Sequence, residues 1–212
     1  MPVLLVRITV PDRPGSLASV TGAIAATGAD VVSIDVLGAE EGRAVDDVAL
    51  RATGADARER IRLALEGLPG VAVESIRVAR GLPGHRPDLD ALTWVARDPG
   101  RALVTYADHL PLMLGADWAV LAEPGPGGTW TLIHRSPGAP AEPDLPLPAT
   151  PVVAARAARD EGSPRTAALV GLAGGRWLFV AVRDEGPPFR RQELLHLQRV
   201  TDLFVLLAEP TQ

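Results

Sequence analysis

The chain has 212 residues, 22% of them charged, and a net charge of −5, a composition typical of an ordinary globular protein of one or two domains. Residues 1–80 carry 9 Arg against 11 acidic residues, and residues 81–212 carry 12 against 15. Neither part has the basic excess of a nucleic-acid-binding domain. Because the chain has no Cys, a disulfide, a thiolate nucleophile and a zinc–cysteine site are excluded.

From the sequence we expect neither a membrane span nor an export signal. It has no run of about 18 apolar residues that could span a bilayer. The N-terminus begins with a strand pattern, whereas a signal peptide would begin with a charged stretch followed by an apolar core. We therefore expect a cytoplasmic protein with no membrane partner.

The first predicted strand leads directly into a helix start. Apolar residues alternate from Leu4 to Val10, and Asp12-Arg-Pro-Gly15 follows. The next twelve residues have a helical pattern that ends at Gly28, and a second strand begins at Asp30. The sequence thus predicts a strand–turn–helix–strand unit in which the helix starts immediately after Gly15.

This helix start is the best candidate for a binding site in the sequence. Gly15 has no Cβ, so the backbone can approach a ligand closely. The unpaired N–H groups of Gly15, Ser16 and Leu17 would lie at the positive end of the helix, where a carboxylate or a phosphate binds. The alternative is a purely structural role, in which Asp12 and Gly15 only form the turn and Asp30 only caps the chain leaving the helix.

The remaining elements of the first 80 residues complete a βαββαβ order. Strands are predicted at 31–37 and 44–51, joined by a turn at 38–42, and a last strand at 71–78. Ile61, Leu65 and Leu68 form one stripe of a second helix. The order predicts an α+β, ferredoxin-like fold with four antiparallel strands and two helices on one face.

The Asp12–Gly15 turn, the Gly28–Asp30 segment and this element order resemble the ACT domain over residues 3–80. The resemblance implies a regulatory module that binds amino acids and controls enzymes of amino-acid metabolism. It also implies that Asp12 binds the ligand, that Gly15 brings the helix start against it, and that Asp30 contributes from the facing subunit of a homodimer. The family usually has Asn at the two Asp positions, and some members have His where Val10 stands. Two carboxylates favour an ammonium group and repel an α-carboxylate.

The second part of the chain follows a predicted linker at 81–91. A helix is expected from Asp98-Pro99 to a kink or end at Pro111. Hairpins are expected at 118–134 and 167–183, separated by an extended proline-rich segment at 136–151 and a short helix at 152–159. A long amphipathic helix opens at Pro187 and runs to about Ala208.

This order, and the stretch Pro188-Phe-Arg-Arg-Gln-Glu-Leu-Leu-His-Leu after the strand at 177–183, resemble a reduced GAF domain related to PAS sensors. The resemblance implies an antiparallel sheet with flanking helices over residues 92–212. A reduced GAF domain would dimerise or transmit a signal and would hold no large cofactor. The domain organisation expected is thus 1–80, the linker, and 92–212.

Three further groups of residues were candidates for chemistry. Asp35, Glu40, Glu41, Asp46 and Asp47 flank one hairpin and could attract a divalent cation, but a solvated edge is favoured. His85, His109, His134 and His196 form no metal-binding spacing, so no metal is expected. The aromatics of the second part are expected in the core, with a small-molecule pocket as the alternative: Trp118, Trp130, Trp177, Phe179 and Phe204.

The leading hypothesis is a non-catalytic sensor that binds an amino-acid-like ligand through Asp12, Gly15, Ser16, Leu17 and Asp30, without a cofactor. It would act as a homodimer, with a regulated protein as a further partner. The alternative is an interaction scaffold whose ACT module has lost its ligand. An enzyme is not expected because the sequence has no nucleophile, base or metal cluster at usable spacing.

Overall fold

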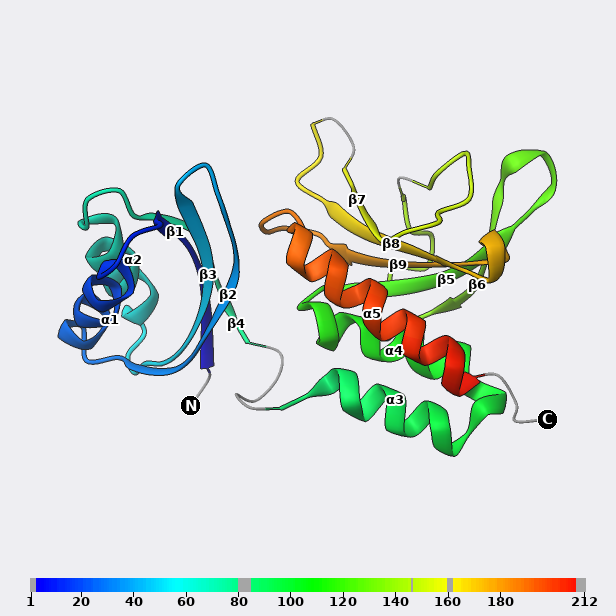
Figure 1. The fold of residues 1–212 in the computed structure, drawn as a ribbon, viewed down its shortest axis with the longest axis horizontal. Coiled ribbons are helices and arrows are strands. Elements are labelled where there is room, and N and C mark those ends of the chain that lie inside the picture. The colour runs from blue at the N-terminus through cyan, green and yellow to red at the C-terminus, as the bar shows by residue number, and fades with distance from the viewer. Residues whose placement is uncertain (1–2, 80–84, 146, 160–161, 209–212) are drawn as a thin grey trace. The chain divides into compact units, whose positions relative to one another are not determined.

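The computed structural model describes residues 3–79, 85–145, 147–159 and 162–208 (Figure 1). Its internal contacts divide the chain into two units, Met1–His85 and Arg86–Gln212. Each unit has its own sheet and its own hydrophobic core, so each is described by itself. Within the described residues, every helix is too short or too polar to cross a membrane.

The N-terminal unit has the predicted α+β, βαββαβ fold. Its sheet has four antiparallel strands in the order β2-β3-β1-β4, and both helices cover one face (Figure 1). The elements are β1 Val3–Pro11, α1 Ser16–Ala26, β2 Asp30–Glu40, β3 Arg43–Arg51, α2 Ala57–Glu66 and β4 Ala72–Val78.

Period-2 alternation in β1 builds the core of this unit. Its even-numbered residues from Leu4 to Val10 are buried on the helix-covered face. They share one cluster with Val20 and Ile24 of α1 and with Ile61 and Leu65 of α2, residues that repeat at helical spacing.

The hairpin between β2 and β3 is tighter than the sequence suggested. We expected a turn over 38–42, but β2 extends to Glu40, which pairs with Arg43. The turn itself consists of Glu41 and Gly42, whose φ angles are 53° and 74°. Two positive φ angles in succession are the signature of a type I′ turn, which matches the twist of antiparallel strands.

The C-terminal unit has the predicted antiparallel sheet with flanking helices. Its five strands are ordered β6-β5-β9-β8-β7. The elements are α3 Pro87–Arg97, η1 Pro99–Arg101, α4 Ala102–Leu114, β5 Trp118–Pro124, η2 Pro126–Gly128, β6 Trp130–Arg135, β7 Arg156–Ala158, β8 Thr166–Leu172, η3 Ala173–Gly175, β9 Trp177–Arg183 and α5 Arg191–Ala208.

Both faces of this second sheet are buried. Phe179 and Ala181 of β9 pack with α4 and α5, whereas Leu178 and Val180 pack with Val152 and other residues of the irregular segment between β6 and β7. This explains why β5, β8 and β9 are nearly continuous apolar runs without alternation.

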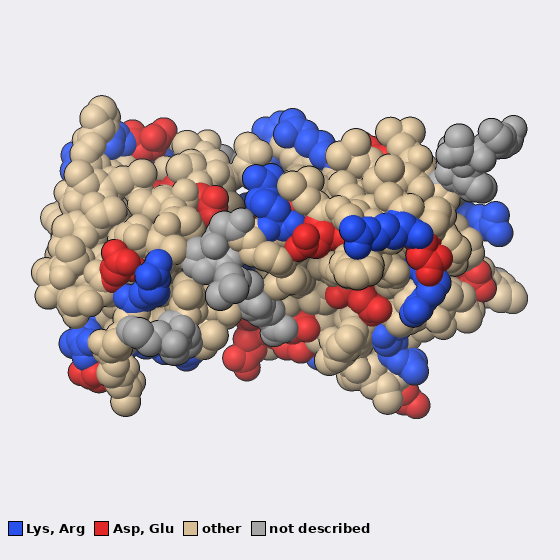
Figure 2. Space-filling model, turned by 90° about the horizontal axis from the view of Figure 1, so that it is seen from below, with Lys and Arg blue, Asp and Glu red and all other residues tan. Residues whose placement is uncertain are grey.

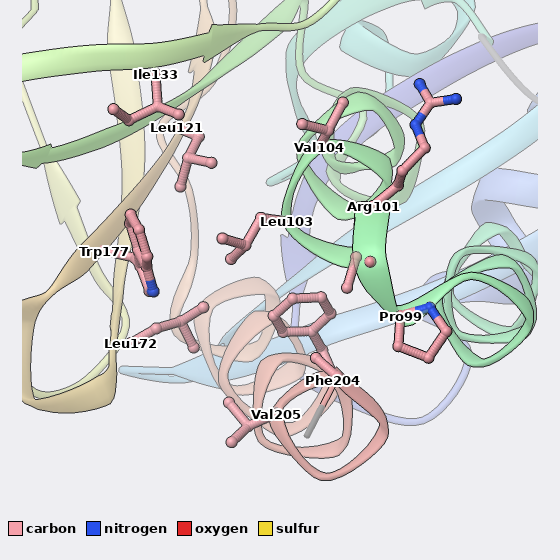
Figure 3. A pocket seen from close by; sticks show the side chains of 13 residues that line it. Pro99, Arg101, Leu103, Val104, Leu121, Ile133, Leu172, Trp177, Phe204 and Val205 are labelled. Atoms are coloured by element: carbon pink, nitrogen blue, oxygen red, sulfur yellow. The ribbon is translucent and has the colours of Figure 1, made fainter. Parts of the chain in front are cut away.

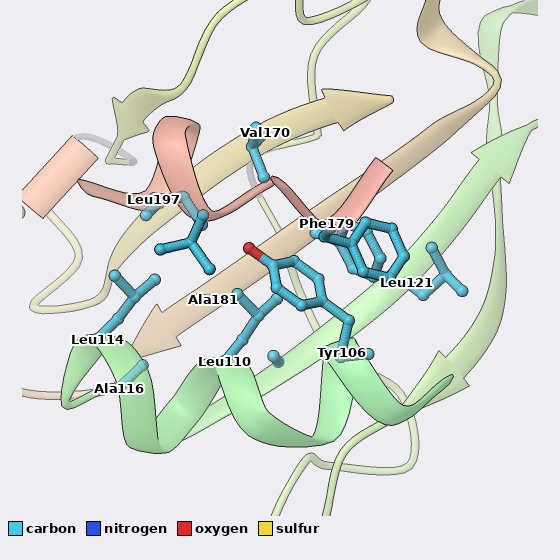
Figure 4. Packing of buried hydrophobic residues seen from close by; sticks show 14 of the residues in the cluster. Tyr106, Leu110, Leu114, Ala116, Leu121, Val170, Phe179, Ala181 and Leu197 are labelled. Carbon is cyan, nitrogen blue, oxygen red and sulfur yellow. The ribbon is translucent and has the colours of Figure 1, made fainter. Parts of the chain in front are cut away.

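An aromatic trio forms the centre of the helix-covered core (Figure 4). The rings of Tyr106 and Phe204 stack with their centroids 4.5 Å apart, and Phe179 meets both edge-on. The Tyr106 hydroxyl lies 2.8 Å from Thr201 Oγ1, which itself donates to the Leu197 carbonyl. Burial raises the pKa of Tyr106, so its hydroxyl stays protonated. Because Thr201 already donates to Leu197, the Tyr106 hydroxyl donates the hydrogen bond to Thr201 Oγ1.

One of the sequence expectations for helices in this unit was wrong. Helix α3 begins at Pro87, inside the predicted linker, because Pro at the first position and two Asp in the first turn form a helix start. Of the kink or end expected at Pro111, the end does not occur, since α4 continues through this proline to Leu114. The first part of the predicted linker, residues 81–84, lies outside the described residues.

The short helix expected at 152–159 is also wrong, since this segment contains β7, paired with β8. Tertiary packing overrides local propensity here, because Val152 is buried against the sheet. The chain crosses β8 so closely that a Cβ placed on Gly171 would lie 2.0 Å from the Val152 carbonyl oxygen. Only glycine allows this approach.

Candidate functional site

The turn between β1 and α1 has the backbone geometry that the sequence predicted. Asp12 is exposed, and its N–H donates to the Gly42 carbonyl at 2.8 Å, which ties the turn to the β2–β3 hairpin. Gly15 has φ 91° and ψ −12°, and α1 begins at the next residue. A Cβ on Gly15 would meet no atom within 4 Å, so glycine is needed for its left-handed backbone and not for space.

The predicted anion site is a shallow surface feature. Gly15 is exposed, and Ser16 and Leu17 are half-buried. The Ser16 N–H donates to the Arg13 carbonyl at 3.3 Å, so one of the three N–H groups is already used within the turn. No side-chain oxygen caps the start of α1.

Asp30 is far from this turn within one chain. It is the exposed first residue of β2 and pairs with Arg51, whereas Pro11, the last residue of β1, pairs with Arg43. Eight residues of β3 separate the two positions, about 27 Å at roughly 3.4 Å per residue. The fold therefore brings Asp12, Gly15, Ser16 and Leu17 together and leaves Asp30 at the opposite end of the sheet.

Asp46 is an unusual residue near the Asp12 turn. It lies opposite Ile8, on the helix-covered face, and is 1% exposed. Among the described residues, neither of its carboxylate oxygens has a hydrogen-bond partner. Burial raises the pKa of Asp46, and the nearby charges of Asp47 and Asp12 raise this pKa further. The sequence analysis grouped Asp46 with the solvated acidic residues of the hairpin, although Ala44, Asp46, Val48 and Leu50 alternate as a core face.

The sequence suggested that all the acidic residues of the hairpin are solvated, and the structure shows that some are buried. Asp35 and Glu41 are exposed, but Asp46 and Asp47 are buried. Asp47 accepts two hydrogen bonds from the buried Arg7, at 2.8 Å from Nε and 2.7 Å from Nη2. Over the part of the chain that the structure describes, no group of three or more His, Cys, Asp or Glu is placed to hold a metal ion.

A second candidate site is a pocket of about 400 Å³ in the C-terminal unit (Figure 3). It lies between the start of α4, the end of α5 and one end of the sheet. The aromatics singled out in the sequence divide: Trp177 and Phe204 line this pocket, whereas Trp118 belongs to the opposite face of the sheet. The lining residues are Pro99–Val104, Leu121, Ile133, Leu172, Trp177, Phe204, Val205 and Ala208.

A polar pair lies beside these elements. His134 Nε2 of β6 is 2.7 Å from Asp108 Oδ1 of α4, and both side chains are half-buried. The pair connects an edge strand to a helix, and no residue spacing in the sequence predicts it. On the surface drawn in Figure 2, Arg and acidic side chains lie next to one another in place of a large patch of one sign.

Comparison with known proteins supports the assignment of the N-terminal unit. Residues 4–70 match the family model of the ACT domain, from β1 to the end of the loop after α2. The resemblance predicted from the Asp12–Gly15 turn is therefore confirmed. A search of curated proteins found no match.

Three solved structures are similar to this chain, two over about half of it and one over nearly all of it. A formyltetrahydrofolate deformylase from Pseudomonas putida KT2440 is 18% identical, with 45% of this chain covered and a TM-score of 0.28. This chain spans 38% of the length of that protein. A GAF domain from Pseudomonas syringae pv. tomato is 13% identical over 55% of this chain and 82% of its own, with a TM-score of 0.38. A protein from Galdieria sulphuraria is 14% identical over 97% and 91% of the two chains, with a TM-score of 0.32.

Proposed function

We propose, from the ACT match over residues 4–70, that the N-terminal unit binds a small amino-acid-like ligand and that the chain is a non-catalytic regulator. The observation that carries this proposal is the start of α1 at a left-handed Gly15, with the exposed Asp12 carboxylate in the same turn. A helix start attracts an anionic group and a carboxylate attracts a cationic one, so the turn suits a zwitterion.

In this proposal the ligand carboxylate accepts hydrogen bonds from the N–H groups of Gly15 and Leu17, and Asp12 takes the ammonium group. Asp30 lies about 27 Å away in the same chain, eight residues along β3. It can therefore contribute only from a second copy. A ligand held between two copies stabilises the homodimer by mass action, and a change in dimer population is a signal that a regulated partner can read.

The second candidate is an interaction scaffold without a ligand. Two observations favour it: the Ser16 N–H is already bonded to Arg13, and the buried Asp46 adds negative charge near Asp12. Both features weaken the attraction for an α-carboxylate.

A thermal-shift screen of the twenty amino acids distinguishes the two candidates, followed by calorimetry on any hit. We expect a ligand that raises the melting temperature, and Asp12→Ala and Asp30→Ala variants that bind it at least about tenfold more weakly. Asp35→Ala is the matched control, because Asp35 is exposed on the same strand as Asp30. A hit that survives both Asp12→Ala and Asp30→Ala refutes the site, and a screen without hits favours the scaffold.

A further inference from the structure

We propose that the pocket between α4, α5 and the sheet of the C-terminal unit binds a small aromatic molecule that carries one hydrogen-bond acceptor. This site is separate from the turn at Asp12 and would give the chain a second ligand. The proposal rests on the size of the pocket, on the chemistry of its walls and on one unpaired donor.

The walls of the pocket are mostly apolar and come from seven elements, η1, α4, β5, β6, β8, β9 and α5. Leu103 of α4, Leu121 of β5, Leu172 of β8, Trp177 of β9 and Val205 of α5 surround one space (Figure 3). A volume of about 400 Å³ lies within the usual range of small-molecule sites. Arg101 is the charged residue of the lining, and Figure 3 shows its guanidinium directed away from Trp177 and Leu172. The walls therefore favour an uncharged apolar ligand.

One wall is held rigid by the aromatic trio. Phe204 lines the pocket, yet its ring is fixed from behind by stacking on Tyr106 and by the edge of Phe179. The hydrogen bond between Tyr106 and Thr201 fixes the ring of Tyr106 against α5. A wall that is already ordered loses little side-chain entropy when a ligand binds, which favours a preformed site.

Trp177 supplies the polar selectivity. The guanidinium carbon of Arg176 lies 4.9 Å from the Trp177 ring centroid and covers one face of the indole. The indole N–H of Trp118 donates to Asp184 and that of Trp130 to the Pro148 carbonyl. Among the described residues, the Trp177 N–H has no such partner, and Figure 3 shows it on the side of the ring toward Leu172. A ligand with one acceptor would satisfy this donor.

Quinoline and naphthalene test the proposal on the full chain, because they have nearly the same shape and only quinoline has an acceptor. The readout is the Trp177 indole signal in a ¹H–¹⁵N correlation spectrum, assigned with Trp177→Phe. We expect quinoline to shift this signal saturably and naphthalene to bind about two- to tenfold more weakly, the worth of one hydrogen bond. In Trp177→Phe, measured by calorimetry, the two probes should bind equally.

Blocking variants decide where the probe binds. Val205→Trp fills the pocket and should weaken quinoline binding at least about tenfold. Leu206→Trp is the matched control, since Leu206 is the next residue of α5, is 71% exposed and is not in the lining. Ile133→Trp, at the exposed rim, replaces Val205→Trp if that variant does not fold.

Three results would overturn the proposal. The first is the absence of a saturable shift up to the solubility limit of quinoline. The second is unchanged affinity in the blocking variants. The third is a shift of the Trp177 signal with protein concentration alone, together with a dimeric mass, because a second copy of the chain would then occupy the pocket.

Discussion

Asp46 is the residue whose charge fits its surroundings least. Its pKa is raised, so the protonated form is favoured by the fold, and stability is lost as the pH rises from the unfolded pKa through the folded one. We expect Asp46→Asn to stabilise the N-terminal unit by about 1–3 kcal/mol at pH 7, since it removes a buried charge without a partner. The gain in stability should vanish below about pH 3.8, the ordinary pKa of an aspartate carboxyl group.

Denaturant unfolding at pH 7 and pH 3 measures this effect. Asp35→Asn, an exposed carboxylate of the same hairpin, should change stability by less than about 0.5 kcal/mol. A loss of stability in Asp46→Asn at pH 7 would mean that the carboxylate is favourably paired in solution.

Two glycines of the same segment should respond to alanine in opposite directions. Gly15 has φ 91° and open space, so Gly15→Ala costs only backbone strain, about 1–2 kcal/mol. Gly22 lies inside α1, also with open space, so Gly22→Ala should stabilise by about 0.5–1 kcal/mol. Thermal unfolding of the two variants checks the signs. Equal effects of the two substitutions would show that Gly15 does not adopt a left-handed backbone.

At the scale of elements, Arg183 fixes the end of α4 to the start of α5. Its Nη2 donates to the Leu114 carbonyl and to Glu193 Oε1, both at 2.6 Å, and its Nη1 donates to the Pro187 carbonyl at 3.0 Å. Glu193 Oε2 in turn accepts the Arg190 N–H at 2.8 Å. Arg183 is 1% exposed, so its removal leaves the Glu193 carboxylate and the carbonyls of Leu114 and Pro187 without this donor.

We therefore expect Arg183→Met to destabilise the C-terminal unit by about 3–5 kcal/mol in denaturant unfolding. Arg165→Met is the control, because the Arg165–Asp184 pair is partly exposed and should contribute less than about 1 kcal/mol. A small effect of Arg183→Met would show that water replaces the guanidinium at these carbonyls.

Periodicity explains which elements could be predicted. Strand β1 alternates and helices α2 and α5 have apolar stripes, so the sequence located these three elements well. Strand β9 has no alternation and was located by its continuous apolar run. The segment at 152–159 could not be predicted, because its conformation depends on the burial of Val152 against residues of β5 and β9, which are distant in the sequence. The start of α3 has a local signal in Arg86-Pro-Asp-Leu-Asp, but the polar residues before it led to its assignment as part of the linker.

The candidate sites were likewise predictable only where their geometry is local. The Asp12–Gly15 turn was visible because its geometry is local and needs specific residue types. The buried position of Asp46 depends on strand register, and the pocket depends on the packing of seven elements. Neither of these features leaves a local pattern in the sequence.

At the scale of the whole molecule, two separate cores predict two unfolding events. The N-terminal and C-terminal units each bury their own cluster of apolar side chains. We expect calorimetry to show two transitions, of which Asp46→Asn shifts one and Arg183→Met shifts the other. A single transition that moves with both variants would show that the two units unfold as one cooperative block.

The close crossing at Gly171 has a consequence for solubility. The missing side chain lets the segment at Val152 lie on the sheet and cover the apolar residues of its second face. Any larger residue there would lift this cover and expose an apolar sheet face to other molecules, which promotes aggregation. A single hydrogen atom at this position thus separates a sheet covered on both faces from one that presents an apolar surface to its neighbours.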